Sequence, residues 1–158
     1  ADLPAPITNI FFIFYSKINV LKYYFCLIKR SNMKTEKFIK AASFLAAIAV
    51  TLGALGAHAL KDILTSEQIA SFQTGVRYQL FHSISILTLA LNAEKFNSKI
   101  YTCLKTMIIG LLCFSFSIYL LNIQYIIGVS LSFLGPITPI GGALLIYSWV
   151  ILIFSIKK

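Results

Sequence analysis

The stretch TMIIGLLCFSFSIYLLNIQYIIGVSLSFLGPITPIGGALLIYSWVILIFSI, residues 106–156, contains no charged side chain. As one helix these fifty-one residues would be about 75 Å long, whereas the hydrocarbon core of a bilayer is about 30 Å thick. The run is therefore long enough to cross a membrane twice. Near its middle the segment GPITPIGG, residues 135–142, is unfavourable inside a regular helix. The stretch predicts two membrane spans with a break between them.

The composition of the whole chain points to the same class of protein. Its 158 residues are 58% hydrophobic and only 12% charged. Backbone groups in lipid must bond to one another, so the spanning structure is either helical or a closed barrel. Barrel strands would alternate polar and apolar residues, and the apolar runs here are continuous. The sequence predicts an all-α integral membrane four-helix bundle with a Gly/Pro-rich break before the last helix.

The net charge of +9 does not indicate a nucleic-acid partner, because the basic residues flank apolar runs instead of forming a stripe. Such flanks are typical of topology signals and of contacts with anionic lipid. The three cysteines, Cys26, Cys103 and Cys113, include no CxxC pair, which argues against a disulfide framework or a zinc site. We expect membrane lipid as a partner, and no nucleic acid, metal or cofactor.

The chain divides at Met33. Residues 1–32 differ in composition and begin without Met, and we interpret them as an upstream or non-native extension; the alternative is an interfacial helix, because their apolar residues recur at helical spacing. Residues 33–158 form the membrane domain, with spans predicted at 41–60, 78–93, 106–121 and 139–156.

Two connections between these spans carry further signals. Thr65 and Gln68 resemble a capping box, which predicts a helix start near Ser66 that could continue into the second span. The uncharged segment 122–138 is too short for another span. It could extend the third helix, lie in the interface or re-enter the membrane.

Charge asymmetry predicts the orientation. The N-terminal flank, the connection between the second and third spans, and the C-terminus carry twelve of the fourteen Lys and Arg residues. By the positive-inside rule both termini face the cytoplasm of a bacterial inner (plasma) membrane.

This topology gathers polar residues at the outer ends of the first two spans. The candidate cluster comprises His58, Arg77, Tyr78, Gln79, His82 and Ser83. Polar groups within a membrane are expected to face the bundle interior and are functional candidates. Three interpretations of the two histidines stay open: hydrogen bonds between the first two helices, a proton or small-solute path, or a facing pair that ligates haem or a metal.

Small residues and the Gly/Pro break allow both structural and functional interpretations. Ala49, Gly53 and Ala57 recur every fourth residue, with Gly56 alongside, and would let another helix approach closely. The break either sets the start of the fourth helix, with Pro139 in its first turn, or exposes unwound backbone to a solute. The acids of residues 33–158 lie outside the predicted spans and no catalytic motif is present, so we do not expect an enzyme.

Three segments resemble a known family. They are GALGAHALK at 53–61, FQTGVRYQLFH at 72–82, and GPITPIGG at 135–142 followed by Trp149. Their order and spacing are similar to those of the YgdD-like family of small uncharacterised membrane proteins, which has relatives similar to transmembrane protein 256 in eukaryotes. The matching positions are Gly53, Gly56, His58, Tyr78, Gln79, His82, Gly135, Thr138, Pro139, Gly141, Gly142 and Trp149.

The resemblance implies a four-helix inner-membrane protein and no established activity. One departure is the segment FSFSIY at 114–119, where the family usually has Gly between the two serines. Phe116 is therefore expected to prevent a close helix approach there.

Three functions follow as hypotheses. The first is association with a second copy, another membrane protein or lipid through the small-residue face of the first span. The alternative is a small transporter or channel component that uses the polar cluster. The third is haem or metal binding by the two histidines.

Overall fold

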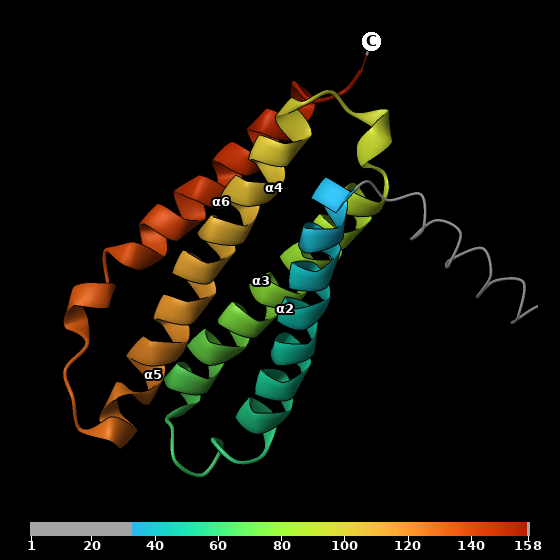
Figure 1. Ribbon diagram of the computed structural model, residues 1–158. Helices are drawn as coiled ribbons and strands as arrows, with labels where there is room; N and C mark the ends of the chain where they lie inside the picture. The colour runs from blue at the N-terminus through green and yellow to red at the C-terminus, as the bar shows by residue number, and fades with distance from the viewer. Residues whose placement is uncertain (1–32, 158) are drawn as a thin grey trace, which may run out of the picture.

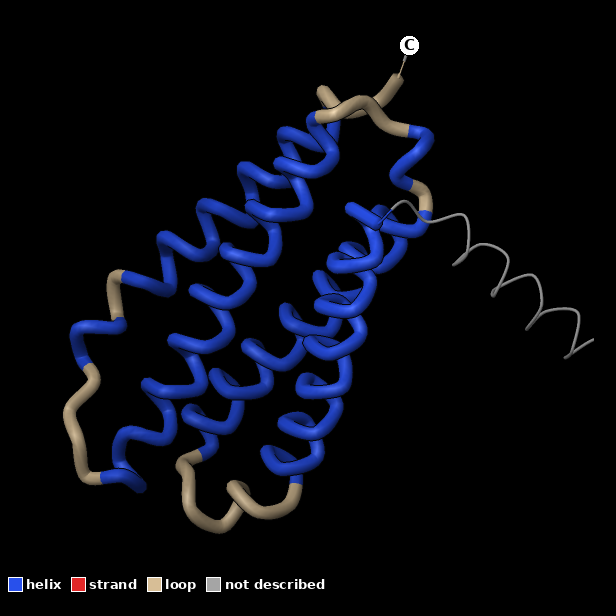
Figure 2. The backbone as a smooth tube through the Cα atoms, in the orientation of Figure 1, coloured by secondary structure: helices blue, strands red, loops and turns tan. Residues whose placement is uncertain are grey.

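The structure is a computed structural model that describes residues 33–157. The predictions for residues 1–32 fall outside this range. Antiparallel helices form the fold, and the start of α2, the turn η1 and the C-terminus lie at the same end of the molecule (Figures 1 and 2). The elements are α2 (Met33–Ala57), α3 (Ser66–Leu91), η1 (Ala93–Lys95), α4 (Lys99–Leu111), the π-helical η2 (Leu112–Phe116), α5 (Ser117–Ile127), η3 (Ser132–Leu134) and α6 (Ile137–Ile153).

Helices α4, η2 and α5 join end to end, and we call them the central rod. Helix α3 packs against α2 on one side and against the central rod on the other, whereas α6 packs on the rod alone among its main contacts. The helices therefore follow chain order across the molecule: α2, α3, central rod, α6 (Figure 1).

Three helical stretches within residues 33–157 are long and apolar enough to cross a membrane: Lys34–Ala57, Lys99–Gln124 and Ser132–Ile153. Helix α3 is also long, at 26 residues, but it is more polar. Its polar residues Gln79, His82 and Ser83 are buried, as expected for polar residues within a membrane. These features confirm the predicted all-α four-helix fold.

Helix α3 begins at Ser66, twelve residues before the span predicted from Tyr78. Thr65 and Gln68 form the capping box. The Thr65 Oγ1 accepts from the Gln68 backbone N–H at 3.3 Å, and the Gln68 Oε1 accepts from the Thr65 backbone N–H at 2.9 Å. The two signals belong to one helix, and its first half adds about 18 Å to the predicted span. Residue 78 is therefore inside α3 and not at its mouth.

The central rod and α6 also extend beyond the predicted spans. Lys99 and Lys105, expected in a connection, lie in the first two turns of α4, where long side chains can reach the membrane interface. Segment 122–138 extends α5 as far as Ile127, turns at Gly128 in the left-handed conformation (φ 72°), and enters α6 through η3. Helix α6 starts at Ile137, two residues before the predicted position.

The small-residue face of α2 is packed against α3 in the same chain. A Cβ atom built on Gly53 would lie 3.3 Å from the Val76 Cγ1, and one on Gly56 would lie 3.0 Å from the Phe72 Cδ1. Ala49 is fully buried. This face therefore brings α2 and α3 together, whereas Ala57 at its end is exposed.

The closest helix contact joins the central rod to α6. A Cβ atom on Gly141 would overlap the backbone of Phe114, and one on Gly110 would lie 3.0 Å from the Leu144 Cβ. The expectation that Phe116 prevents a close approach is wrong. Its side chain is 60% exposed, because two residues along a helix it points to the side opposite Phe114.

Candidate functional site: a hydrogen-bonded seam along α3

Helix α3 carries polar or small residues at every turn along one edge, which is buried from Gly75 onward. Ser71, Gly75, Gln79 and His82 follow the i, i+4 and i+3 spacings that place residues on one helical face. Each of them forms a hydrogen bond to another helix. We call these four residues and their partners the α3 seam.

Gln79 connects three helices at the centre of the seam. Its Nε2 donates to the Leu45 carbonyl of α2 at 2.8 Å, and its Oε1 accepts from the Tyr119 hydroxyl of α5 at 2.8 Å. Ser83, which is fully buried, donates to the Gln79 carbonyl within α3 at 2.6 Å. The amide group is thus fixed from both sides.

Two further bonds join α3 to the central rod. The Ser115 hydroxyl donates to the Gly75 carbonyl at 3.0 Å, and the Asn122 Nδ2 donates to the Ser71 Oγ at 3.1 Å. Gly75 is needed for this approach, because a Cβ there would lie 2.8 Å from the Tyr119 ring. The π-helical segment η2 presents Ser115 toward α3, and Ser117, the first residue of α5, lies 2.7 Å from the Thr138 hydroxyl of α6.

His82 links α3 to α6 and uses both ring nitrogens. Its Nδ1 lies 2.9 Å from the Tyr78 carbonyl, and its Nε2 lies 3.3 Å from the Trp149 Nε1. A carbonyl can only accept and an indole N–H can only donate, so these bonds assign the proton to Nδ1. Trp149, one of the positions that match the family, is therefore a hydrogen-bond partner of the predicted cluster.

Aromatic rings cover the outward side of His82. The Tyr78 ring stacks on the imidazole with centroids 5.8 Å apart and also contacts Phe114 at 4.6 Å, and the Phe81 ring lies 6.3 Å from Trp149. We call the assembly of α2, α3, the central rod and α6 the array. Tyr78 and Phe81 remain substantially exposed on its surface. The rings separate the imidazole from the lipid side.

The structure does not gather the whole predicted cluster. Gln79, His82 and Ser83 lie in the seam, but His58 is exposed beyond the end of α2 and Arg77 is exposed on α3. His82 follows Ser66 by sixteen residues, or about 24 Å along the helix, so it lies far from the loop that holds His58. The facing pair of histidines, one of the three interpretations that the sequence left open, is not formed.

The described residues also contain no group of three or more His, Cys, Asp or Glu side chains that could hold a metal ion. The two histidines are apart and His82 has both nitrogens engaged, so the residues do not fit a haem or metal pair. The third hypothesis therefore has no assembled site.

The Gly/Pro break sets the start of α6 and its packing. Gly135 precedes the helix, Pro136 occupies its N-cap position, and Pro139 lies in its first turn. Gly141 makes the close contact with the central rod, whereas Gly142 leaves ordinary space. Thr138 is held by Ser117. Among these matched positions, Thr138 and Gly141 therefore have a hydrogen-bonding and a packing role, respectively.

Sequence reasoning missed several partners of the seam. They are Leu45, Ser71, Ser115, Tyr119 and Asn122. A signal was present in the spacing, because Ser115, Tyr119 and Asn122 recur at i, i+4 and i+7, which complements the pattern on α3. Within residues 33–157 no buried side-chain nitrogen or oxygen lacks a partner. The seam is therefore saturated.

In this structure a more polar helix lies between apolar helices, and its seam is saturated with hydrogen bonds. These features define a multi-span α-helical membrane protein with an interior held by hydrogen bonds. Comparison with known proteins gives the family. Residues 52–142 match the family model described as "Protein of unknown function (DUF423)". The chain belongs to this family of membrane proteins.

Curated relatives cover most of the chain. The UPF0382 membrane protein YwdK of Bacillus subtilis is 33% identical over 123 residues, which is 77% of this chain and 96% of that protein. The UPF0382 inner membrane protein YgdD of Escherichia coli is 31% identical over 107 residues, 67% of this chain and 78% of the relative. The UPF0382 membrane protein of Haemophilus influenzae is 33% identical over 78% of this chain and 95% of its own length. No solved structure matches.

Proposed function

We propose that this protein acts without catalysis, by association within the membrane, through the outward face of α3 around Arg77. The observation that carries the proposal is an exposed arginine at the depth of the hydrophobic core. Arg77 has no hydrogen bond or ion pair to another side chain among the described residues. We call Arg77, Tyr78, Phe81 and Ile84 the Arg77 face.

The depth of Arg77 follows from its neighbours. It lies eleven residues after Ser66, or about 16 Å along α3. The adjacent Val76 packs beside Gly53, which lies in the uncharged part of α2, four residues before that helix ends at Ala57. The Arg77 backbone is therefore within the apolar depth of the array and not at its end.

An arginine facing hydrocarbon at this depth is costly, by about 2.5–3.5 kcal/mol on insertion scales. Its guanidinium presents five donors in a fixed plane, which suits a carboxylate or a set of carbonyl oxygens. Tyr78, Phe81 and Ile84 are 44%, 59% and 54% exposed around it. A partner helix that offers an acceptor oxygen would satisfy the arginine and cover these apolar side chains. Such a helix could come from a second copy or from another membrane protein.

The saturated seam gives no support to the transporter hypothesis. A proton or solute path needs polar groups that can exchange partners along the interior. Here the buried polar side chains of α3 all have partners, either in neighbouring helices or in α3 itself. The free polar chemistry is on the surface of the array, which is where an association function requires it.

We propose in addition that the basic end of the array faces the cytoplasm of a bacterial inner membrane. The start of α2, the turn η1 and the C-terminus share that end (Figure 1) and carry most of the lysines. The opposite loop carries Lys61 next to Asp62. The positive-inside rule supports this orientation, and the relative YgdD is described as an inner membrane protein.

Photo-crosslinking in the native membrane tests the Arg77 face. A benzophenone amino acid replaces Phe81, and the matched control carries it at Phe44, which is 67% exposed on α2. We expect a discrete protein adduct from position 81 and none from position 44. The adduct should disappear with Arg77→Leu and persist in part with Arg77→Lys, and its mass would distinguish a second copy from another protein.

The opposite results would refute the proposal. They are crosslinks to lipid alone at both positions, or an adduct at position 81 that Arg77→Leu leaves unchanged. Circular dichroism of Arg77→Leu would show that its helices are intact.

A further inference from the structure

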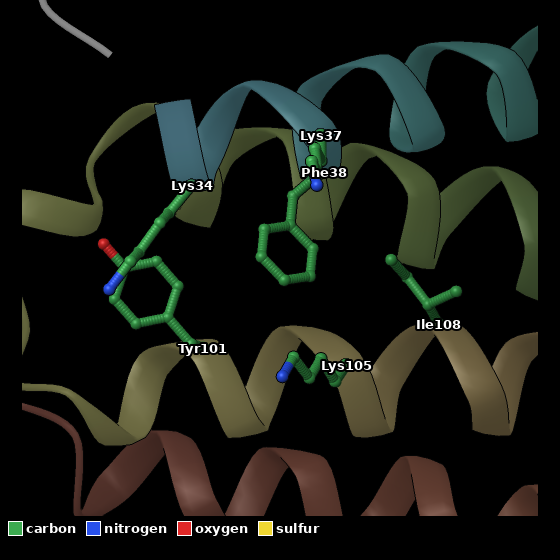
Figure 3. Close-up of a pocket in the computed structure, with 6 residues that line it drawn as sticks. All are labelled: Lys34, Lys37, Phe38, Tyr101, Lys105 and Ile108. Carbon is green, nitrogen blue, oxygen red and sulfur yellow. The ribbon is translucent and has the colours of Figure 1, made fainter. Parts of the chain in front are cut away.

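A second surface feature lies at the basic end of the array, between α2 and α4. A cavity of about 740 Å³ opens there, and Figure 3 shows α2 and α4 on its two sides with three lysines around it. The volume is within the range of about 300–1,000 Å³ that is usual for ligand sites. Its lining residues are Lys34, Lys37, Phe38, Tyr101, Lys105 and Ile108.

The cavity is built from two helical faces. Lys34, Lys37 and Phe38 follow i, i+3, i+4 spacing on α2, and Tyr101, Lys105 and Ile108 follow i, i+4, i+7 spacing on α4. Both sets therefore point toward the space between the helices. The Phe38 and Tyr101 rings make contact between the two helices, with their centroids 6.4 Å apart.

The cavity carries cationic charge that the described residues do not neutralise. No acidic residue lines it. The nearest acid in the sequence, Glu36, is engaged by Lys40 at 2.7 Å. Lys34, Lys37 and Lys105 form no ion pair within residues 33–157. Three ammonium groups around one cavity attract an anion, and the nearby Tyr101 hydroxyl can donate another hydrogen bond.

The depth of the cavity identifies the kind of anion. Lys105 lies six residues into α4, or about 9 Å below its start, where the headgroup region gives way to hydrocarbon. Phe38 and Ile108 supply apolar wall beside it. A soluble phosphate would use the lysines alone. A glycerophospholipid would place its phosphate among the lysines and its first acyl carbons against Phe38 and Ile108.

We infer that this cavity is a binding site for one anionic glycerophospholipid. Basic pockets between membrane helices are known to receive such headgroups. The inference does not depend on the Arg77 face, because the two surfaces share no residue. Each can therefore fail without affecting the other.

Native mass spectrometry of the full chain in detergent tests the site. The probes are phosphatidylglycerol, phosphatidylcholine with the same acyl chains, and sn-glycerol 3-phosphate as a soluble headgroup. The test variant is Lys34→Gln/Lys37→Gln/Lys105→Gln. The matched control is Lys95→Gln/Lys99→Gln/Lys157→Gln, which removes the same charge from exposed lysines at the same end of the array.

We expect one phosphatidylglycerol to be retained in preference to phosphatidylcholine, with no retention of glycerol phosphate. The test variant should weaken phosphatidylglycerol retention by at least about tenfold, since each lysine near an anionic lipid contributes about fivefold. The control should change it by less than about threefold. Ile108→Trp, which narrows the cavity without changing charge, should also reduce retention.

Three outcomes would overturn the inference. Equal losses in the test and control variants would mean general charge attraction. Equal retention of phosphatidylcholine would mean an apolar groove without headgroup recognition. Retention of glycerol phosphate as strong as that of phosphatidylglycerol would replace the lipid with a free phosphate ester.

Discussion

Replacing Gln79 with leucine would remove the central junction of the α3 seam while keeping an apolar side chain of similar length. The substitution eliminates the bond to the Leu45 carbonyl and the bond from the Tyr119 hydroxyl, each 2.8 Å long. Side-chain hydrogen bonds between membrane helices are worth about 0.6 kcal/mol on average and up to about 1.7. We therefore expect Gln79→Leu to lower the free energy of unfolding by about 1–3 kcal/mol.

A double-mutant cycle separates the Gln79–Tyr119 bond from the other effects of the substitution. Tyr119→Phe removes only the hydroxyl and keeps the ring that packs on Phe72, with centroids 4.9 Å apart. Alone it should cost about 0.6 kcal/mol. Because both changes delete the same bond, the double variant should be destabilised by about 0.6 kcal/mol less than the sum of the two.

The assay is unfolding in mixed micelles with increasing sodium dodecyl sulfate, followed by far-ultraviolet circular dichroism. A coupling energy between the two substitutions of less than about 0.3 kcal/mol would mean additive, independent sites. That result would refute the claim that Gln79 and Tyr119 hold α3 to α5. A loss below about 0.5 kcal/mol for Gln79→Leu alone would contradict the central role of this residue in the seam.

Two further predictions test the contacts with α6. His82→Phe keeps a ring but removes the acceptor of the Trp149 indole N–H, so the emission of this single tryptophan should shift to shorter wavelength; an unchanged spectrum would contradict the bond. Gly141→Ala should lower the free energy of unfolding by about 1–3 kcal/mol, because its methyl group would overlap the Phe114 backbone. Gly142→Ala is the control, since its Cβ would lie 3.7 Å from the Phe114 ring, and it should cost less than about 0.5 kcal/mol; similar losses in both variants would contradict the close contact.

Local signals in the sequence predicted the fold class well. An uncharged run longer than one membrane thickness requires a second crossing, and the capping box of Thr65 and Gln68 marked the start of α3 correctly. The extent of α3 was harder to predict, because Arg77 and Gln79 interrupt its apolar pattern. Hydropathy measures the free-energy cost of placing a residue in lipid. It does not register that neighbouring helices cover Gln79 while Arg77 stays exposed.

The candidate site was predicted only in part, for a related reason. Charge asymmetry assigns each residue to a side of the membrane, but depth depends on where each helix begins. Once α3 starts twelve residues earlier, His82 moves from the outer mouth into the array and away from His58. Cross-helix pairs such as Ser71 with Asn122 depend on the register between helices, which no single segment encodes.

The distribution of satisfied and unsatisfied groups connects the fold to the proposed function. Inside the array each buried polar side chain has a partner, so the interior consolidates the position of α3. On the surface, Arg77 and the three lysines of the cavity have no ion pair within the described chain. A cation at membrane depth is stable only beside an acceptor. Since the fold supplies none for Arg77, we expect its acceptor to come from a molecule in the surrounding membrane, and that expectation favours association over chemistry within the array.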